Sequence, residues 1–417
     1  MRRVAPFLVL LLLSQCLTGA APRGPGQEAG AHAYTWDHEF DYITWVADAS
    51  LLKLSQAALG AERYMDEEAQ SRFVRDTMAL VREIQSAEGE LSALHANPNQ
   101  ASVAVQSEEL NAPLDEFTQQ RSRMAPLAES ILQTQIGAIL ADKGFTLLGQ
   151  PLPPLLFHST PLPWALIASP RDSIAQTANI SLRTELTLED HIAIEDQVAN
   201  GLNLSTLVVP VGGIGVYPTM VAQSSDLRWL IEVSSHEWAH NYLTLRPLGL
   251  LYFESRDLTT MNETTANIVG KEMSEAVIAR YYPELVPPPP ALQSAEAPEP
   301  ASQPPAPIFD FRAEMHATRV RVDALLAEGK VEEAETYMEV QRLLFWEHGY
   351  VIRKLNQAYF AFYGSYADTP IGPAGEDPVG AAVRELRTRS DSLIEFVNRM
   401  AWLTSFEDLQ RVLAERP

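Results

Sequence analysis

The chain has 417 residues, with 31 Lys and Arg against 54 Asp and Glu, and therefore a formal net charge of −23 at pH 7. A hydrophobic content of 46% is ordinary for a globular protein and excludes a chain that is disordered as a whole. The acidic balance, with no cluster of basic and aromatic residues, argues against nucleic acid as a partner. This length allows two or three domains or subdomains with a sizeable core.

The N-terminus has the features of a secretory signal. Met1 is followed by two arginines, then by an apolar run over residues 5–13 and by small residues up to Ala21. We therefore predict a signal peptide over residues 1–20 and an extracytoplasmic protein that is secreted, periplasmic or lipid-anchored. No other stretch reaches the roughly 20 apolar residues of a membrane-spanning helix.

Two interpretations of Cys16, the single cysteine, stay open. Its position just after the apolar run resembles a bacterial lipoprotein signal, which implies a lipid on Cys16 as the only attachment to a membrane. Residues 21–36 would then form a flexible tether. Alternatively, cleavage near Ala20 removes the cysteine with the signal. Both interpretations predict a mature protein without a disulfide within the chain.

Residues 37–149 are predicted to form several packed helices to which we assign no chemistry. The apolar residues recur at steps of three and four, as on the core-facing side of a helix. At the start of this region they are Phe40, Ile43, Ala47, Leu51 and Leu54.

Between residues 150 and 221 the pattern changes to short apolar runs separated by Pro, Gly and Asn. β-branched residues and turn formers at this spacing predict a small sheet. The predicted strands are 164–168, 178–182, 207–211 and 214–221.

Helices are predicted again from Asp226 to the C-terminus, with one interruption. Residues 283–309 include four consecutive prolines, Pro287 to Pro290, and are predicted to be a solvated insertion or linker. Residues 310–417 are expected to form a helical C-terminal subdomain.

Residues 236–240 have the sequence His-Glu-Trp-Ala-His inside a run with helical spacing. Residues four apart share one face of a helix, so His236 and His240 can both point toward one cation, while Glu237 lies where it can polarise a metal-bound water. This pattern predicts metal-assisted hydrolysis. An exposed amphipathic helix with two unrelated histidines is the alternative.

A catalytic zinc site takes three protein ligands and leaves one position for water, so a further ligand should follow this helix. The acidic candidates are Glu254, Asp257, Glu263, Glu272 and Glu275.

The segment that starts at Met261-Asn262-Glu263 resembles the second zinc helix of the gluzincin metallopeptidases, which include thermolysin-like proteases and many aminopeptidases. The resemblance implies that Glu263 is the third ligand. It also places Asn267, one helical turn later, where the family has an acid that supports a ligand histidine. Glu254 stays the alternative ligand, because the 22 residues between His240 and Glu263 exceed the usual spacing of the group.

A second resemblance covers the stretch from Leu355-Asn356-Gln357-Ala358 to Tyr366, which is similar to the LNNA…A…Y stretch of a family of predicted bacterial aminopeptidases. It implies that the Tyr366 hydroxyl donates a hydrogen bond to the oxyanion of the reaction. Tyr359 and Tyr363 are alternatives, as is a structural tyrosine in the core.

The glycine-containing run 211–217 has two interpretations. In gluzincins an edge strand that pairs with the substrate precedes the zinc helix, and this run either takes the place of that strand or is a turn.

Together these patterns predict an α+β, mainly α protein with an N-terminal helical region, a small β-sheet, a zinc-binding helix pair and a helical C-terminal subdomain. The metallopeptidase core would span residues 150–282. The expected cofactor is Zn²⁺ held by His236, His240 and Glu263, with Glu237 as proton acceptor in the hydrolysis of a peptide or protein substrate. The resemblance favours an aminopeptidase. The alternative is a non-catalytic envelope protein that binds another protein and has a structural metal site closed by a fourth ligand.

Overall fold

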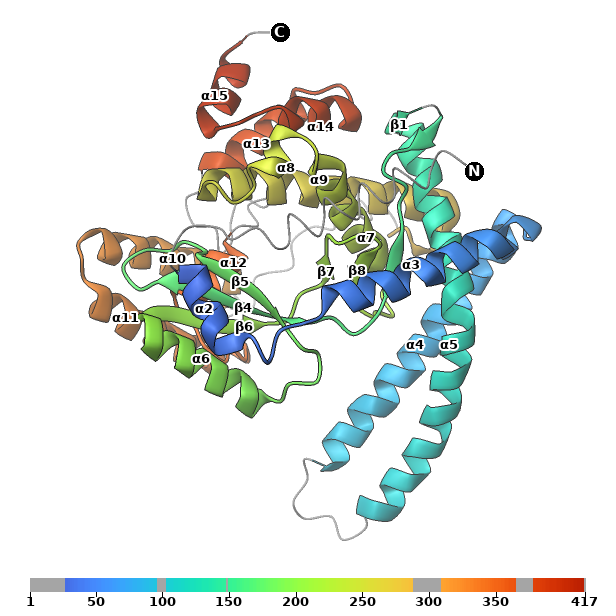
Figure 1. Ribbon diagram of the computed structural model, residues 1–417, viewed down its shortest axis with the longest axis horizontal. Coiled ribbons are helices and arrows are strands. Elements are labelled where there is room, and N and C mark those ends of the chain that lie inside the picture. Colours follow the sequence, from blue (N-terminus) through green and yellow to red (C-terminus); the bar gives the residue numbers. More distant parts are fainter. Residues whose placement is uncertain (1–26, 96–102, 148, 288–308, 365–377, 416–417) are drawn as a thin grey trace, which may run out of the picture.

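The computed structural model describes residues 27–95, 103–147, 149–287, 309–364 and 378–415 (Figure 1). The predicted signal peptide with Cys16, most of the proline-rich segment and Tyr366 lie outside these residues. The fold is mainly α-helical with a few small sheets, which confirms the predicted class. No helix among the described residues combines the length and the apolar character needed to cross a membrane.

The described part of the predicted tether is helical. Helix α2 spans Gln27–Thr35 and packs on helix α6 (Leu188–Leu202) and strand β5 (Ala178–Leu182). Its Ala31 is fully buried. The prediction of a flexible tether is therefore wrong for residues 27–35, because small residues of α2 fit closely against the body.

The N-terminal helical region is confirmed and continues with helix α3 (Tyr42–Leu59), the 3₁₀ turn η1 (Ala61–Tyr64) and the long helices α4 (Glu67–His95) and α5 (Val103–Asp142). Helices α4 and α5 lie side by side and project from the body (Figure 1).

The apolar face predicted for α3 does not face the core. Ile43, Leu51 and Leu54 are 76%, 66% and 60% exposed, whereas Lys53 and Gln56 are buried. The reason is a buried ion pair, in which Lys53 Nζ lies 2.5 Å from Glu129 Oε2 of α5. Because this pair lies between the two helices, the polar side of α3 faces inward.

The predicted strands are found, but in two three-stranded sheets rather than one. In the first, the central strand β4 (Trp164–Pro170) is antiparallel to both β5 and β6 (Leu204–Val209). In the second, β8 (Thr219–Val221) pairs in parallel with β3 (Phe157–Ser159) and antiparallel with β7 (Gly213–Ile214). A two-stranded hairpin joins β1 (Thr146–Leu147) and β2 (Gln150–Pro151).

Helix α6, between β5 and β6, was not predicted. Thr187 caps it by accepting a hydrogen bond from the Asp190 N–H, while the Asp190 carboxylate accepts from the Thr187 N–H. This reciprocal pair stabilises the first turn of a helix whose apolar residues Ile194 and Val198 are buried.

The C-terminal helices pack in two places, which differs from the single subdomain expected. Helices α10 (Phe311–Ala327) and α11 (Val331–Glu347) pack on each other, and α12 (Gln357–Tyr363) packs on β4 and β6. Helices α13 (Pro378–Thr388), α14 (Leu393–Ala401) and α15 (Phe406–Ala414) instead pack around α8 (Pro247–Leu250) and α9 (Arg256–Tyr281).

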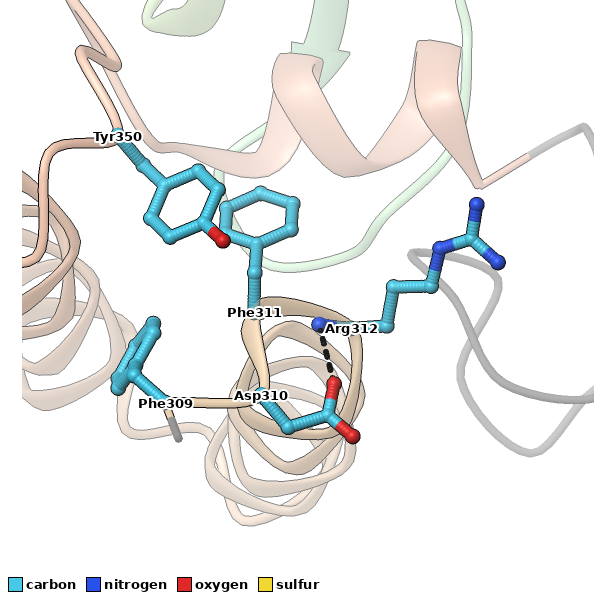
Figure 2. Close-up of a pocket in the computed structure, with 5 residues that line it drawn as sticks. All are labelled: Phe309, Asp310, Phe311, Arg312 and Tyr350. Carbon is cyan, nitrogen blue, oxygen red and sulfur yellow. Dashed lines mark hydrogen bonds between the residues drawn. The ribbon is translucent and has the colours of Figure 1, made fainter. Parts of the chain in front are cut away.

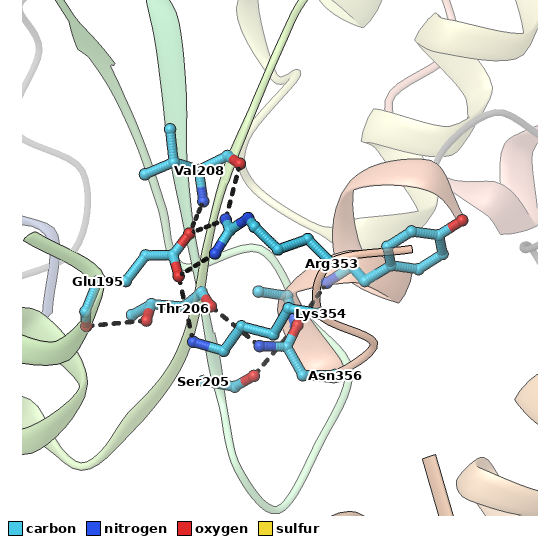
Figure 3. Close-up of polar contacts among 9 residues, drawn as sticks. Glu195, Ser205, Thr206, Val208, Arg353, Lys354 and Asn356 are labelled. Carbon is cyan, nitrogen blue, oxygen red and sulfur yellow. Dashed lines mark hydrogen bonds and ion pairs between the residues drawn. The ribbon is translucent and has the colours of Figure 1, made fainter. Parts of the chain in front are cut away.

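A polar cluster fastens the segment before α12 to the first sheet (Figure 3). The buried Glu195 carboxylate of α6 accepts a 2.6 Å hydrogen bond from the Val208 N–H of β6 and pairs with Arg353 and Lys354. Asn356 then donates to the Thr206 carbonyl at 2.9 Å. The segment that precedes α12 is thus fixed on β6 by ion pairs and by hydrogen bonds to the backbone of β6.

The main hydrophobic core surrounds α7 (Leu227–Leu243) and α9, the two helices that contain the predicted metal ligands. Asp226 caps α7 by accepting from the Trp229 N–H at 3.1 Å. Gly270 of α9 lies so near the Glu232 carbonyl of α7 that a Cβ would be 2.7 Å away, and this glycine therefore permits the close approach of the two helices.

Candidate metal centre

Helices α7 and α9 bring together the three residues predicted as zinc ligands. His236 and His240 lie one turn apart on α7, and Glu263 lies on the adjacent face of α9. The Nε2 atoms of the two histidines are 3.0 Å apart, and Glu263 Oε2 lies 3.4 Å from His236 Nε2 and 3.6 Å from His240 Nε2.

These distances match the geometry of a bound cation. Zinc takes nitrogen and oxygen ligands at about 2.0–2.2 Å, and a tetrahedral arrangement then separates the ligand atoms by about 3.4 Å. The two Nε2 atoms and Glu263 Oε2 form a triangle whose centre is about 1.9 Å from each atom. An ion slightly above the plane of this triangle would therefore lie at a normal zinc–ligand distance from all three atoms. The group can therefore hold a metal ion.

The polar atoms of the group also indicate a cation. Glu263 Oε2 is buried and accepts no hydrogen bond from the described residues. A buried carboxylate oxygen without a donor is costly unless a positive charge faces it. A divalent cation between Glu263 and the two imidazoles would supply that charge.

The charges within the group act on one another strongly. Burial disfavours the imidazolium of His240, but the Glu263 carboxylate outweighs it and raises the pKa of His240 to about 9. Burial alone would raise the pKa of Glu263, yet the facing His240 and His236 hold it well below its usual range. A cation bound here would displace the imidazole protons and take over their role toward Glu263.

Asn262 is a site residue that the sequence interpretation missed. Its Oδ1 accepts a hydrogen bond from His240 Nδ1 at 2.8 Å, and its Nδ2 donates to the Leu248 carbonyl at 3.1 Å. The amide is thereby oriented, and it leaves the lone pair of His240 Nε2 directed toward the metal position. The supporting role expected of Asn267 stays a prediction. The Asn262-Glu263 pair is visible in the sequence, but the sequence did not indicate that Asn262 supports His240.

Tyr252 is the second residue that was missed. Its hydroxyl donates to Glu263 Oε1, and its ring stands edge-on to His240 with centroids 6.1 Å apart. One Glu263 oxygen is thus held by a phenol while the other faces the histidines. No spacing rule connects Tyr252 with Glu263, so only the packing of the segment around α8 reveals this contact.

Glu237 lies beside the group and under strand β7. It is 7% exposed, and burial raises its pKa although His236 and His240 oppose the shift. A Cβ on Gly213 would lie 2.7 Å from Glu237 Cγ, and one on Gly215 would lie 3.3 Å from Glu237 Oε2. Strand β7 is at the edge of its sheet. A tight turn follows it, in which the Val216 N–H donates to the Ile214 carbonyl at 2.8 Å. The glycine run 211–217 therefore contains both a short edge strand and a turn.

The other acidic candidates do not join the group. Glu254, the alternative third ligand, is exposed, as are Asp257 and Glu275. Glu272 instead forms an ion pair with Arg387 of α13. Glu263 is thus the only one of these acids that the structure brings to the histidines.

The two described tyrosines offered as alternatives to Tyr366 lie on α12. The rings of Tyr359 and Tyr363 contact each other in a tilted arrangement, with centroids 4.5 Å apart, and pack with the hydrophobic cluster on β4 and β6. Burial raises the pKa of both hydroxyls. This packing supports a structural role for the pair.

A separate open pocket lies at the start of α10 (Figure 2). It is lined by Phe309, Asp310, Phe311, Arg312 and Tyr350, with the rings of Phe311 and Tyr350 stacked at 4.4 Å. It shares no residue with the metal group.

Comparison with known proteins adds no relative: no family model, no curated protein and no solved structure matches the chain. The gluzincin resemblance therefore stays a prediction based on the motifs themselves.

Proposed function

We propose that this chain is a zinc-dependent hydrolase of peptide bonds. The observation that supports this most is the convergence of His236, His240 and Glu263 on one point, with the Glu237 carboxylate next to it. Two imidazoles and a carboxylate form a donor set that suits zinc. An ion held there would supply Lewis-acid polarisation and lower the pKa of a coordinated water.

Three further residues would transfer the proton and hold the metal ligands in position. Glu237 accepts the proton of the attacking water and delivers it to the leaving amine. Its buried position favours this role, since a carboxylate with a raised pKa holds a proton more readily. Asn262 fixes the ring of His240, and Tyr252 fixes Glu263.

The number of ligands supports a catalytic rather than a structural site. A structural zinc is closed by four protein ligands, whereas a catalytic one keeps a position open. Among the described residues, three ligand side chains come together and no fourth joins them.

The finer parts of the proposal rest on sequence resemblance. An aminopeptidase is favoured by the stretch 355–366, and an extracytoplasmic location by residues 1–20. The alternative, a non-catalytic envelope protein, needs a fourth protein ligand at the metal and no proton acceptor.

The substitution Glu237→Gln separates these functions. It keeps the size of the side chain but removes its ability to take a proton, so peptide cleavage should fall by about 10²–10⁴-fold while zinc content stays at one per chain. Metal analysis and digestion of a peptide library measure the two quantities. Glu275→Gln, at an exposed position of α9, is the matched control and should behave as wild type. A Glu237→Gln protein that cleaves within a few-fold of wild type would refute the mechanism.

A further inference from the structure

The first turn of α3 is fixed at the edge of the first sheet. Strand β5 is the edge strand there, and the Phe40 N–H donates to the Ser181 carbonyl at 3.0 Å. Asp41 caps α3 by accepting hydrogen bonds from the N–H groups of residues 43 and 44. The backbone of Tyr42, the first residue of the helix, is therefore held from both sides.

Two contacts orient the side chain of Tyr42. Its hydroxyl lies 2.7 Å from Ser181 Oγ, and its ring stands edge-on to Phe40 with the centroids 5.1 Å apart. Either of the two hydroxyls can be the donor of their hydrogen bond. When Ser181 donates, the phenol oxygen accepts, and the hydrogen of the phenol is available to another acceptor.

The Tyr42 hydroxyl lies within electrostatic reach of the Glu237 carboxylate. Burial raises the pKa of Tyr42 to about 12, the hydrogen bond with Ser181 opposes this shift, and the negative charge of Glu237 adds to it. Figure 1 shows the first turn of α3 next to β7, the strand that passes over Glu237. The phenol stays protonated at neutral pH, as a hydrogen-bond donor must.

The Glu237 carboxylate accepts no hydrogen bond from the described residues and interacts with Tyr42 through charge alone. Buried polar groups normally have hydrogen-bond partners. A carboxylate and a phenol that lie close together without bonding to each other therefore leave room for a third polar group between them.

The other tyrosines considered for a role in the reaction are engaged elsewhere or lie outside the described residues. Tyr252 donates to Glu263, and Tyr359 and Tyr363 pack against β4 and β6. Tyr366 belongs to the part of the chain that the structure does not describe.

We propose that Tyr42 is a catalytic residue of the proposed hydrolysis, on which this inference rests. Its hydroxyl donates a hydrogen bond to the carbonyl oxygen of the scissile peptide, while Ser181 holds the phenol in place. The negative charge that develops on this oxygen strengthens the hydrogen bond in the transition state, so the bond lowers the barrier more than it aids substrate binding. Glu237 acts on the attacking water and the leaving amine, and the two side chains thus have separate tasks.

The substitution Tyr42→Phe tests this assignment, because it removes only the hydroxyl. We expect kcat to fall about 10²–10³-fold, KM to change by less than about threefold and zinc content to stay at one per chain. Tyr64→Phe, at a position that is 89% exposed, is the matched control and should behave as wild type. Ser181→Ala keeps the phenol and should lower kcat less than Tyr42→Phe does. Far-UV circular dichroism and thermal melting show whether each variant is folded.

A second measurement needs no turnover. A phosphinic peptide imitates the tetrahedral transition state, so its affinity for the zinc-loaded protein should also fall about 10²–10³-fold in Tyr42→Phe. Calorimetry measures this affinity, and Tyr64→Phe should leave it unchanged.

A conservative replacement keeps the proposal testable if Tyr42→Phe does not fold. Fluorotyrosine at position 42 retains the hydroxyl but makes it more acidic. The variant should keep kcat near neutral pH and lose it at a lower alkaline pH than wild type, because an ionised phenol cannot donate. A purely structural tyrosine would leave the pH profile of kcat unchanged.

The failure of this assignment is distinguishable from the failure of the proposed function. A zinc-loaded wild type that cleaves no peptide contradicts the hydrolysis, and the phosphinic peptide then decides the role of Tyr42. The assignment is overturned if Tyr42→Phe keeps kcat within a few-fold of an active wild type. It is also overturned if wild type binds the phosphinic peptide no more tightly than Tyr42→Phe does.

Discussion

Of the two carboxylates considered as the third ligand, Glu263 and Glu254, only Glu263 faces the metal position. Glu263 lies 3.4 Å from His236 Nε2, whereas Glu254 is exposed. Glu263→Ala should therefore weaken zinc by more than the roughly 10–100-fold that loss of a supporting residue costs, and Glu254→Ala should leave it unchanged. Competition with a zinc-chelating dye measures both affinities. The reverse order would assign the third ligand to Glu254.

Asn262 and Asn267 lie on helix α9, and the structure and the sequence resemblance point to different members of this pair as the support of a ligand histidine. Because Asn262 accepts from His240 Nδ1, Asn262→Ala should weaken zinc binding about 10–100-fold, and Asn262→Asp, which keeps the acceptor, should retain most of it. Asn267→Ala is measured in the same dye assay and compared with Asn262→Ala. If Asn267→Ala has the larger effect, the supporting role belongs to that residue, as the family resemblance implies.

The attachment of α12 to the first sheet depends on one buried carboxylate. Arg353 pairs with Glu195, whose side chain is 2% exposed. Arg353→Met removes one partner of the Glu195 carboxylate and should lower the free energy of unfolding by about 2 kcal/mol. The loss is smaller than for a fully buried ion pair, because Lys354 and the Val208 N–H still contact the carboxylate. Urea denaturation measures the change.

The control for this element is a surface pair with a similarly exposed arginine. Arg399 is 33% exposed and pairs with Glu395 within α14, against 34% for Arg353. Arg399→Met should change the free energy of unfolding by less than about 1 kcal/mol. Equal losses in the two variants would show that the Glu195 cluster does not hold the element in place.

The stability of the whole molecule should depend on acid through a buried pair that joins α3 to α5. Burial would raise the pKa of Glu129, but Lys53 and His158 outweigh it and hold the pKa below its usual value of 4.5. A carboxyl group whose pKa is lower in the folded than in the unfolded protein stabilises the fold at any pH above its pKa in the unfolded chain. This stabilisation is lost as the pH falls through the pKa that the group has in the folded protein. Burial also lowers the pKa of Lys53, which reduces the net gain at neutral pH.

The free energy of unfolding of the metal-free protein should therefore fall from about pH 5 downward, and less steeply in the double variant Lys53→Met with Glu129→Leu. Near pH 7 the double variant should be within about 2 kcal/mol of wild type, since both charges are removed together. Urea midpoints from pH 7 to pH 3 give both slopes. Identical slopes would show that this pair does not determine the acid response.

Local patterns predicted the parts of the fold that depend on neighbouring residues. The helical spacing of His236 and His240 places both imidazoles on one face because four residues are about one turn, and the structure confirms it. The spacing in α3 predicted a helix for the same reason. It could not tell which side is buried, because the ion pair of Lys53 with Glu129 joins residues far apart in the chain.

Sequence alone therefore determined the mainly α class, most strands and the two histidines on one face of a helix, since each has a signature in spacing, composition or a short motif. Tertiary structure alone decided that Glu263 rather than Glu254 meets the histidines, and that Asn262 and Tyr252 support the site. It also decided that the C-terminal helices divide between two cores. These features arise where helices distant in the chain pack together, and no local pattern specifies which distant surfaces will meet.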